Sequence, residues 1–298
     1  MHYITSFSGR QYKSYVQGGG RERRPIKFFP KGYFNSIFSM RYISVLLIVL
    51  LLSQGKAYGA SWGAVDERVG NTATFSWGWP DENDLTPICN ASQCIVTVGP
   101  WDPGGGPPSG GINNPAYVLQ KVVVNSGATT RDAFIAWTKE YGIAGQYRMR
   151  MWPAGVDTSN ACFGFQSFVG AGTGFRTGTL LPGTTCGLVP PPNLTCDVYL
   201  GSEINLGVVP RGASGVSGGV DGSVTCSSSA TIYSSLINRP ELDGNNVAIS
   251  INGVKLNNQP HGVGRGKQVS LNVVANIEGK LDNAGVYETS AIILFSYQ

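Results

Sequence analysis

The sequence predicts an all-β protein made of two β-sandwich domains. Gly, Ser, Thr, Asn and Val recur throughout, and short apolar or alternating runs follow one another between turn residues. Only one stretch carries a helical period. Many short strands joined by frequent turns are typical of sandwich architectures.

The expected elements follow from these patterns. The helix is predicted over 130–141, capped by Thr129 or Thr130, with Phe134 and Trp137 (or Ile135 and Lys139) on one face. The predicted strands are residues 72–77, 94–98, 117–124, 147–152, 222–226, 230–237, 247–256, 267–277 and 290–297.

The first 59 residues are expected to be a leader. A basic Arg41, an apolar run over 43–52 and small residues at Ala57 and Gly59 have the three-part form of a secretory signal peptide, assigned to about 40–59. The apolar run is shorter than the roughly 20 residues of a membrane-spanning helix. Residues 1–39 are interpreted as an upstream start artefact or an unusual leader, with a functional basic tail as the alternative.

The net charge changes sign when the leader is set aside. Residues 1–59 hold 9 of the 22 Lys and Arg and 1 of the 18 Asp and Glu, so the mature chain from Ala60 carries 13 basic and 17 acidic residues, a net −4. A net charge of −4 does not suggest a basic surface that would bind a phosphate backbone, so nucleic acid is not expected as a partner.

The six cysteines all follow the leader, which indicates three disulfides in an exported protein. Six cysteines allow 15 connectivities; we favour pairing between sequence neighbours. Zinc is disfavoured because no CxxC occurs and His261 is the only histidine after the leader. The favoured pairs are Cys89–Cys94, Cys162–Cys186 and Cys196–Cys226.

A run of three prolines, Pro190 to Pro192, marks a domain boundary, since it resists helix and sheet and behaves as a stiff spacer. The expected domains are therefore 60–192 and 193–298.

The 193–298 domain ends in a recognisable motif. Gly285 stands fourteenth from the end, Ile293 and Phe295 alternate, and Tyr297 is penultimate; a cysteine pair about 30 residues apart opens the domain. In these features the domain resembles the pilin domain of chaperone–usher fimbriae. The resemblance implies an immunoglobulin-like sandwich that lacks its final strand, with Gly285, Ile293, Phe295 and Tyr297 beside a groove. A chaperone strand, then a strand of an adjacent subunit, would fill this groove by strand addition.

The domain before residue 193 indicates which position the chain takes in the fibre. Residues 60–192 show no donor arm after Ala60, and a subunit that accepts a strand without offering one belongs at the fibre tip. The resemblance thus implies a two-domain tip adhesin, carried through the periplasm by a chaperone and an outer-membrane usher to the cell surface. Its receptor is expected to be a carbohydrate or glycoprotein.

Four segments of the chain carry a narrower resemblance: PICNASQCIVTV, NPAYVLQ, Cys162 followed by FGF, and LLPGTTCGLVPPP running into Cys196. In these segments the chain resembles the tip adhesins of mannose-resistant Proteus-like fimbriae. That family holds zinc with three histidines, two of them after the strand that matches CIVTV. The corresponding positions here are about Gly99, Pro100 and Trp101, and 60–192 contains no histidine, so no metal or other cofactor is expected.

Candidate ligand-binding residues are Trp101, Asp102, Arg148 and Arg150. An aromatic face stacks on sugar rings and carboxylates bind hydroxyls, while Arg148 and Arg150 alternate onto one strand face opposite Met149. Each has a structural alternative: loop packing for the tryptophan, a turn before Pro103 for the aspartate, and a solvated face for the arginines.

Catalysis is not expected. A Ser-His-Asp or Cys-His arrangement would need His261, which lies in the structural domain. The acidic residues of 81–84 are interpreted as part of a solvated polar turn. A structural, non-binding fimbrial subunit is the main alternative function, and a secreted hydrolase is a distant one.

Overall fold

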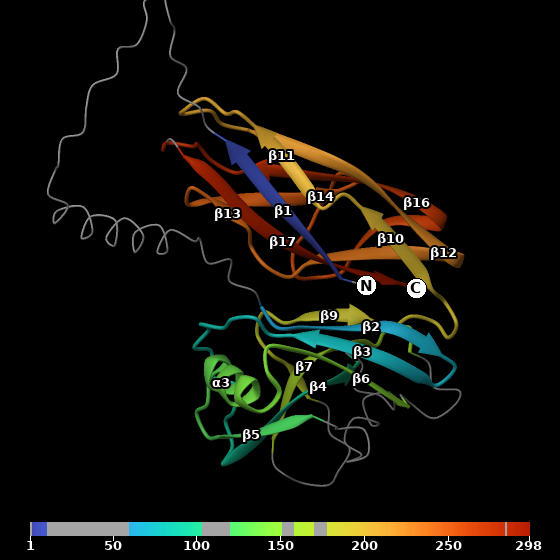
Figure 1. Cartoon of the computed structure of the whole chain (residues 1–298). Coiled ribbons are helices and arrows are strands. Elements are labelled where there is room, and N and C mark those ends of the chain that lie inside the picture. Colours follow the sequence, from blue (N-terminus) through green and yellow to red (C-terminus); the bar gives the residue numbers. More distant parts are fainter. Residues whose placement is uncertain (1, 11–59, 103–119, 151–157, 170–177, 284) are drawn as a thin grey trace, which may run out of the picture. The chain divides into compact units, whose positions relative to one another are not determined.

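The computed structural model describes residues 2–10, 60–102, 120–150, 158–169, 178–283 and 285–298; for 2–10 and Arg150 only the backbone is described. Strands dominate these ranges and form two curled sheets, so the predicted all-β, two-domain, sandwich-like class is confirmed (Figure 1). One helix, α3 (Thr130–Tyr141), lies among the described residues.

The first sheet contains eight strands in the order β5-β4-β7-β9-β2-β3-β6, with β8 paired to β7. It curls until β6 faces β4, where the Tyr147 hydroxyl donates to the Val98 carbonyl at 3.2 Å. The strands are β2 (Trp62–Val69), β3 (Thr72–Gly78), β4 (Gln93–Trp101), β5 (Lys121–Asn125), β6 (Ala144–Arg150), β7 (Cys162–Val169), β8 (Thr179–Leu180) and β9 (Thr185–Leu188).

Aromatic side chains fill the core of this sheet. Trp77 on β3 and Trp79, one residue after the strand, are both buried. The Trp77 ring meets the Trp137 ring edge-on at 5.2 Å, and the Trp79 ring lies 4.8 Å from the Phe165 ring. Large rings in these tilted arrangements bury much apolar area, which fixes α3 against the sheet.

Helix α3 begins and ends where the pattern predicts. Thr129 is the N-cap: its side chain accepts from the Asp132 N–H, and the Asp132 carboxylate accepts from the Thr129 N–H, which completes a capping box. Trp137 is fully buried and Phe134 packs against the core, whereas Ile135 is 54% exposed. The Phe134 and Trp137 face is therefore the inner one.

The second sheet contains nine strands in the order β11-β1-β17-β12-β16-β14-β13, with β10 paired to β12 and β15 to β14 (Figure 1). Asn252 and Gly253 turn β14 into β15 with φ of 51° and 81°, a pair that suits a tight hairpin. The strands are β1 (His2–Arg10), β10 (Cys196–Leu200), β11 (Glu203–Gly207), β12 (Ser217–Leu236), β13 (Glu241–Leu242), β14 (Asn245–Ile251), β15 (Val254–Lys255), β16 (His261–Ile277) and β17 (Val286–Tyr297).

Three disulfides join the cysteines in the favoured pairs. Cys89–Cys94 closes the turn before β4, Cys162–Cys186 joins β7 to β9, and Cys196–Cys226 joins β10 to β12. Pairing between sequence neighbours is confirmed. In β12 the two predicted runs form a single long strand, whose pairing with β16 shifts register between Thr225 and Ala230.

The proline run between the two sheets is held in place. The Arg68 guanidinium, buried on β2, donates to the Pro190 carbonyl at 2.9 Å and to Thr158 Oγ1 at 2.7 Å. The Asn193 N–H donates to the Arg68 carbonyl at 2.8 Å. The expected stiff spacer is thus bound along β2, and the buried residues change from the first core to the second between Val189 and Leu194.

Candidate functional site

The terminal strand β17 is paired along one edge with β12. The register runs from Tyr297 opposite Ile232 to Ile293 opposite Leu236. At the end of the strand, the Gln298 N–H donates to the Thr231 carbonyl and the Thr231 N–H donates to the Gln298 carbonyl. The last strand of the sequence is therefore an integral part of the sheet.

A buried amide continues this edge where β12 leaves it. The Asn238 side chain donates from Nδ2 to the Ser290 carbonyl at 2.6 Å, and its Oδ1 accepts from the Ile292 N–H at 2.6 Å. A primary amide presents one donor and one acceptor as a peptide group does, so Asn238 replaces a strand residue in the ladder. It is 3% exposed, which makes both bonds costly to lose.

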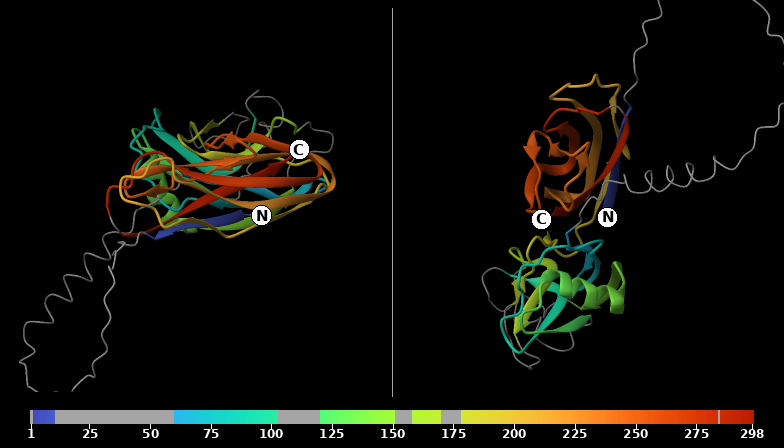
Figure 2. Two further views of the ribbon diagram at one scale, coloured as in Figure 1. Left: turned by 90° about the horizontal axis from the view of Figure 1, so that it is seen from above. Right: turned by 90° about the vertical axis from the view of Figure 1, so that its left-hand side faces the viewer.

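The other edge of β17 is paired with β1. Nine consecutive positions run antiparallel, from His2 opposite Leu294 to Arg10 opposite Val286. On its far side β1 runs parallel to β11, with Ser6 opposite Glu203. The blue strand β1 lies beside the red strand β17 in Figures 1 and 2. We call the space between β17 and β11, which β1 occupies, the terminal slot.

The terminal slot changes two expectations. The edge of β17 is expected to lie open until another protein fills it, yet here the chain itself fills it. Residues 2–10 are assigned to the leader, and sequence reasoning missed their strand. The segment does carry a strand signal, because it is rich in aromatic and β-branched residues, which favour strands: Tyr3, Ile4, Thr5 and Phe7.

The residues predicted to border the groove lie in β17 or just before it. Ile293, Phe295 and Tyr297 are buried in the core of the second sheet, together with Ala291. Gly285 lies just before β17, where a Cβ would come 3.2 Å from the Tyr287 ring. The alternating apolar residues therefore form the core face of the strand.

The opposite face of β17 packs on the first sheet. Leu294 is buried with Ile237 against Trp62 and Ala64 of β2, and Ile292 packs on the same cluster. From Ala291 to Tyr297 the residues of the terminal strand are thus buried or half-buried, whereas Val286 and Glu288 at its start are exposed.

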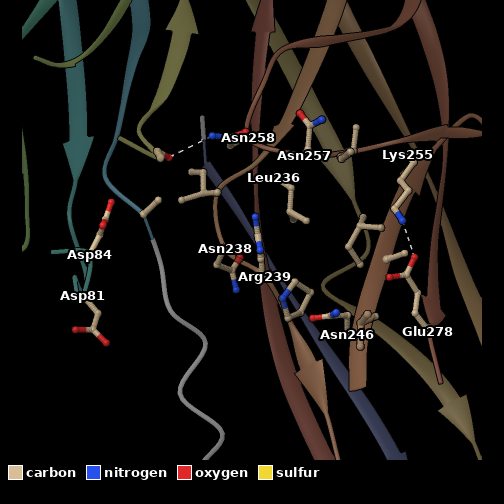
Figure 3. Close-up of a pocket in the computed structure, with 18 of the residues that line it drawn as sticks. Asp81, Asp84, Leu236, Asn238, Arg239, Asn246, Lys255, Asn257, Asn258 and Glu278 are labelled. Atoms are coloured by element: carbon tan, nitrogen blue, oxygen red, sulfur yellow. Dashed lines mark hydrogen bonds and ion pairs between the residues drawn. The ribbon is translucent and has the colours of Figure 1, made fainter. Parts of the chain in front are cut away.

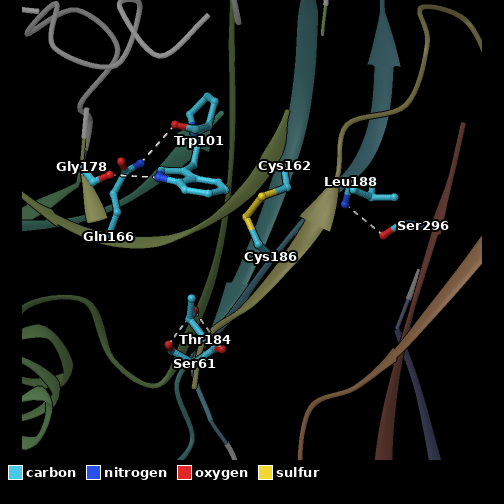
Figure 4. Close-up of a disulfide and its surroundings, with 10 residues drawn as sticks. Ser61, Trp101, Cys162, Gln166, Gly178, Thr184, Cys186, Leu188 and Ser296 are labelled. Atoms are coloured by element: carbon cyan, nitrogen blue, oxygen red, sulfur yellow. Dashed lines mark hydrogen bonds between the residues drawn. A yellow bond between two sulfur atoms is a disulfide. The ribbon is translucent and has the colours of Figure 1, made fainter. Parts of the chain in front are cut away.

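Two hydrogen bonds reinforce this packing. The Leu188 N–H donates to Ser296 Oγ at 3.2 Å (Figure 4), and the Tyr297 hydroxyl donates to the Asp66 carbonyl at 3.3 Å. Burial raises the pKa of Tyr297 above its usual value, and the Asp66 charge adds to this effect. The penultimate tyrosine is consequently held in its neutral, donating form.

The predicted ligand residue Trp101 is the last residue of β4 and is half-buried. Its indole N–H donates to the Gly178 carbonyl at 2.9 Å, and beside it Gln166 Nε2 donates to the Pro100 carbonyl at 3.1 Å (Figure 4). Because the N–H is used within the protein, only the ring face could meet a ligand. Asp102 follows and is half-buried; the loop after it lies outside the described residues.

The predicted arginines lie on β6, at the far end of the sheet order. Arg148 is exposed while Met149 is buried, so the predicted alternation of faces holds. Arg150 stands opposite Thr72 in the register, and its side chain is outside the description. In the sheet order β7, β9, β2 and β3 stand between Trp101 and Arg148, so pairing within the sheet does not bring the two together.

A cavity of about 590 Å³ opens where the turn 81–84 meets the segment 236–240 and β14 (Figure 3). The residues of this turn are half-buried or exposed, and its carboxylates bind their own loop. Glu82 accepts from the Trp79 indole at 3.2 Å and from the Asp84 N–H at 2.9 Å. On the other wall Lys255 and Glu278 form an ion pair at 2.5 Å. The Glu82 carboxylate and the Lys255–Glu278 pair are thus bonded within the protein.

The described ranges contain no group of three or more His, Cys, Asp or Glu side chains placed to hold a metal ion. Within the same ranges, no helix is long and apolar enough to cross a membrane. The signal peptide assigned to about 40–59 lies outside the described residues.

Comparison with protein-family models gives no match for the chain, and comparison with curated proteins gives none either.

Proposed function

We propose that this chain is a two-domain tip adhesin of the chaperone–usher type. Residues 60–192 bind a receptor, which we expect to be a carbohydrate or glycoprotein, and residues 193–298 join the fibre by accepting a strand. The periplasmic chaperone, the usher and the adjacent subunit are the expected partners, and the cell surface is the expected location.

The terminal slot is the observation that carries this proposal. Strands β11 and β17 each border it, and the strand between them comes from a distant part of the sequence. A sheet built this way has two open edges whenever that strand is absent, and unpaired edges recruit other strands. Strand addition from a partner fits this geometry directly.

The joining role is tested with the chain from Ala60 to Gln298. Made alone, it should aggregate or be degraded, because the slot exposes backbone groups and the apolar floor of Ile204 and Ile293. A synthetic peptide that copies residues 2–10 should rescue a soluble, protease-resistant form, whereas a scrambled peptide should not. A stable monomer without any peptide would contradict the proposal.

The binding role is tested on a glycan array with the peptide-stabilised chain, with and without a chelator. Binding should survive chelation, since no histidine occurs in 60–192. Trp101→Ala and Arg148→Ala should weaken it, and Tyr199→Ala, at an exposed residue of β10, is the matched control. No binding to any glycan would contradict a carbohydrate receptor, and loss on chelation would contradict metal independence.

A structural fimbrial subunit is the second candidate, and one observation favours it. The chain carries a strand, β1, whose register fits such a slot over nine positions. If β1 enters the slot of another copy, the full chain should polymerise as its concentration rises, and light scattering would measure this. A monomer at every concentration would exclude it.

A further inference from the structure

We propose that residues His2–Arg10 are a self-donated strand that closes the terminal slot of their own chain. A partner strand can then join β17 only when β1 leaves. The slot is then an interaction surface that residues 2–10 of the same chain occupy first. Receptor binding plays no part in this.

The backbone pairing specifies this occupant closely. The antiparallel register with β17 is unbroken over nine positions, from His2 to Arg10. The parallel register with β11 shifts once, between Ser8 and Gly9, so that Gly9 falls opposite Gly207. A strand that pairs on both sides satisfies its own N–H and C=O groups as well as those of two edges.

The first half of β17 depends most on β1. Pairing with β12 covers Ile293 to Tyr297, and Asn238 bonds the strand at Ser290 and Ile292. From Val286 to Thr289 the paired strand is β1. Without β1 this half would become an exposed edge, with Ala291 and Ile204 lying buried just beneath the slot.

Tethering gives the self-donated strand an advantage over any free one. A segment of the same chain binds intramolecularly, at an effective concentration set by the linker that joins it to the sheet. A competing strand at lower concentration must therefore pair better with the slot or wait until β1 is removed. Cleavage after the signal peptide expected at about 40–59 would remove β1 and open the slot.

A disulfide trap in the full chain tests the register. Ser8 stands opposite Glu288, and residues directly opposite in an antiparallel pair have Cα atoms about 4.5–5.5 Å apart, within disulfide reach. The Ser8→Cys, Glu288→Cys variant should form a bridge within one molecule on mild oxidation. The Ser6→Cys, Glu288→Cys variant shifts the pair by two positions, about 7–8 Å away in such pairs, and should not.

The size of the bridged product separates the outcomes. A bridge within the monomer in the first variant alone supports the self-donated strand. Equal bridging in both variants, no bridging, or a bridge that joins two molecules overturns it. If the double variants fail to fold, hydrogen exchange on the unsubstituted chain decides. Along 286–289 alternate amides point toward β1 and should exchange slowly, and fast exchange at all of these amides overturns the proposal.

Displacement is tested with a labelled peptide that copies residues 2–10. Supplied above the effective concentration of the tethered strand, it should enter the slot of the reduced Ser8→Cys, Glu288→Cys chain, fail to enter the oxidised chain, and enter again after reduction. Equal entry into both forms would show that β1 does not close the slot. None of these readouts involves a receptor or a fibre, so they succeed or fail independently of the proposed function.

Discussion

At the scale of single residues, Arg68 is a buried side chain that no sequence pattern singles out. It is 5% exposed on β2 and donates to Gly70, Thr158 and Pro190, so one guanidinium ties a turn, a loop and the proline run together. Arginine suits this position because its planar fork presents several donors in fixed directions.

Replacing Arg68 by leucine should leave buried acceptors at Thr158 and Pro190 without donors. We expect a loss of about 2–3 kcal/mol in the free energy of unfolding, the usual cost for hydrogen bonds from a charged group. Urea denaturation would measure it. Arg148→Leu, an exposed arginine on β6, is the matched control and should stay within about 0.5 kcal/mol. Equal effects would contradict the anchoring role of Arg68.

Tyr147 predicts how stability depends on alkaline pH. Its ring stands 5.4 Å from the Phe75 ring, and burial raises its pKa well above the usual 10.0. A raised pKa in the folded state means that the unfolded chain loses this proton first. The contribution of Tyr147 to stability is therefore fully present below about pH 10 and is lost as the pH rises beyond it.

The Tyr147→Phe variant checks that prediction. It should lose about 0.5–1.5 kcal/mol at pH 7, because the bond to Val98 is gone. Between pH 10 and 11 its stability should fall less steeply than that of the natural chain. Tyr199→Phe, at a residue 64% exposed, should leave the slope unchanged. Thermal unfolding followed at several pH values would show whether the slopes differ; parallel curves would refute the assignment.

At the scale of elements, local sequence chemistry was sufficient for α3 but not for β17. The capping box and the spacing of Phe134 and Trp137 act within one turn of helix, so both ends of α3 were predictable. The neighbours of β17 come from positions as far away as His2 and Asn238, and no local pattern encodes such pairings.

Asn238→Ala should weaken the terminal strand. The change leaves the Ser290 carbonyl and the Ile292 N–H unpaired where water cannot easily reach, at a cost of about 1–3 kcal/mol. Hydrogen exchange at Ile292 should become faster, and chemical denaturation would give the energy. Asn276→Ala removes an exposed amide on β16 and should have little effect. Unchanged exchange at Ile292 would show that Asn238 does not support the ladder.

At the scale of the whole molecule, β17 contributes to two cores through alternate residues. Ile293 belongs to the core of the second sheet, while Leu294 packs on Trp62 and Ala64 of the first. The first sheet accommodates it at Gly187, where an added Cβ would lie 3.3 Å from Leu294 Cδ2 and 2.6 Å from the Gly63 carbonyl.

Two neighbouring alanine substitutions should therefore act on different parts of the chain. Ile293→Ala removes buried volume from the second sheet and should cost about 2–5 kcal/mol, with faster hydrogen exchange in β12 and β16. Leu294→Ala should speed exchange in β2 around Trp62 and Ala64 more than in β16. The same exchange pattern in both variants would contradict the division of β17 between two cores.

The sequence by itself determined the fold class, the helix and the pairing of the cysteines, because these depend on composition, local spacing and proximity along the chain. It also identified the apolar alternation of β17 at Ile293 and Phe295, and the structure places both side chains in the core of the second sheet. Only the tertiary structure decided what covers that strand. Its partners are β12, Asn238, β1 and the first sheet, and pairing between distant segments depends on the packed whole, which no single stretch of sequence contains.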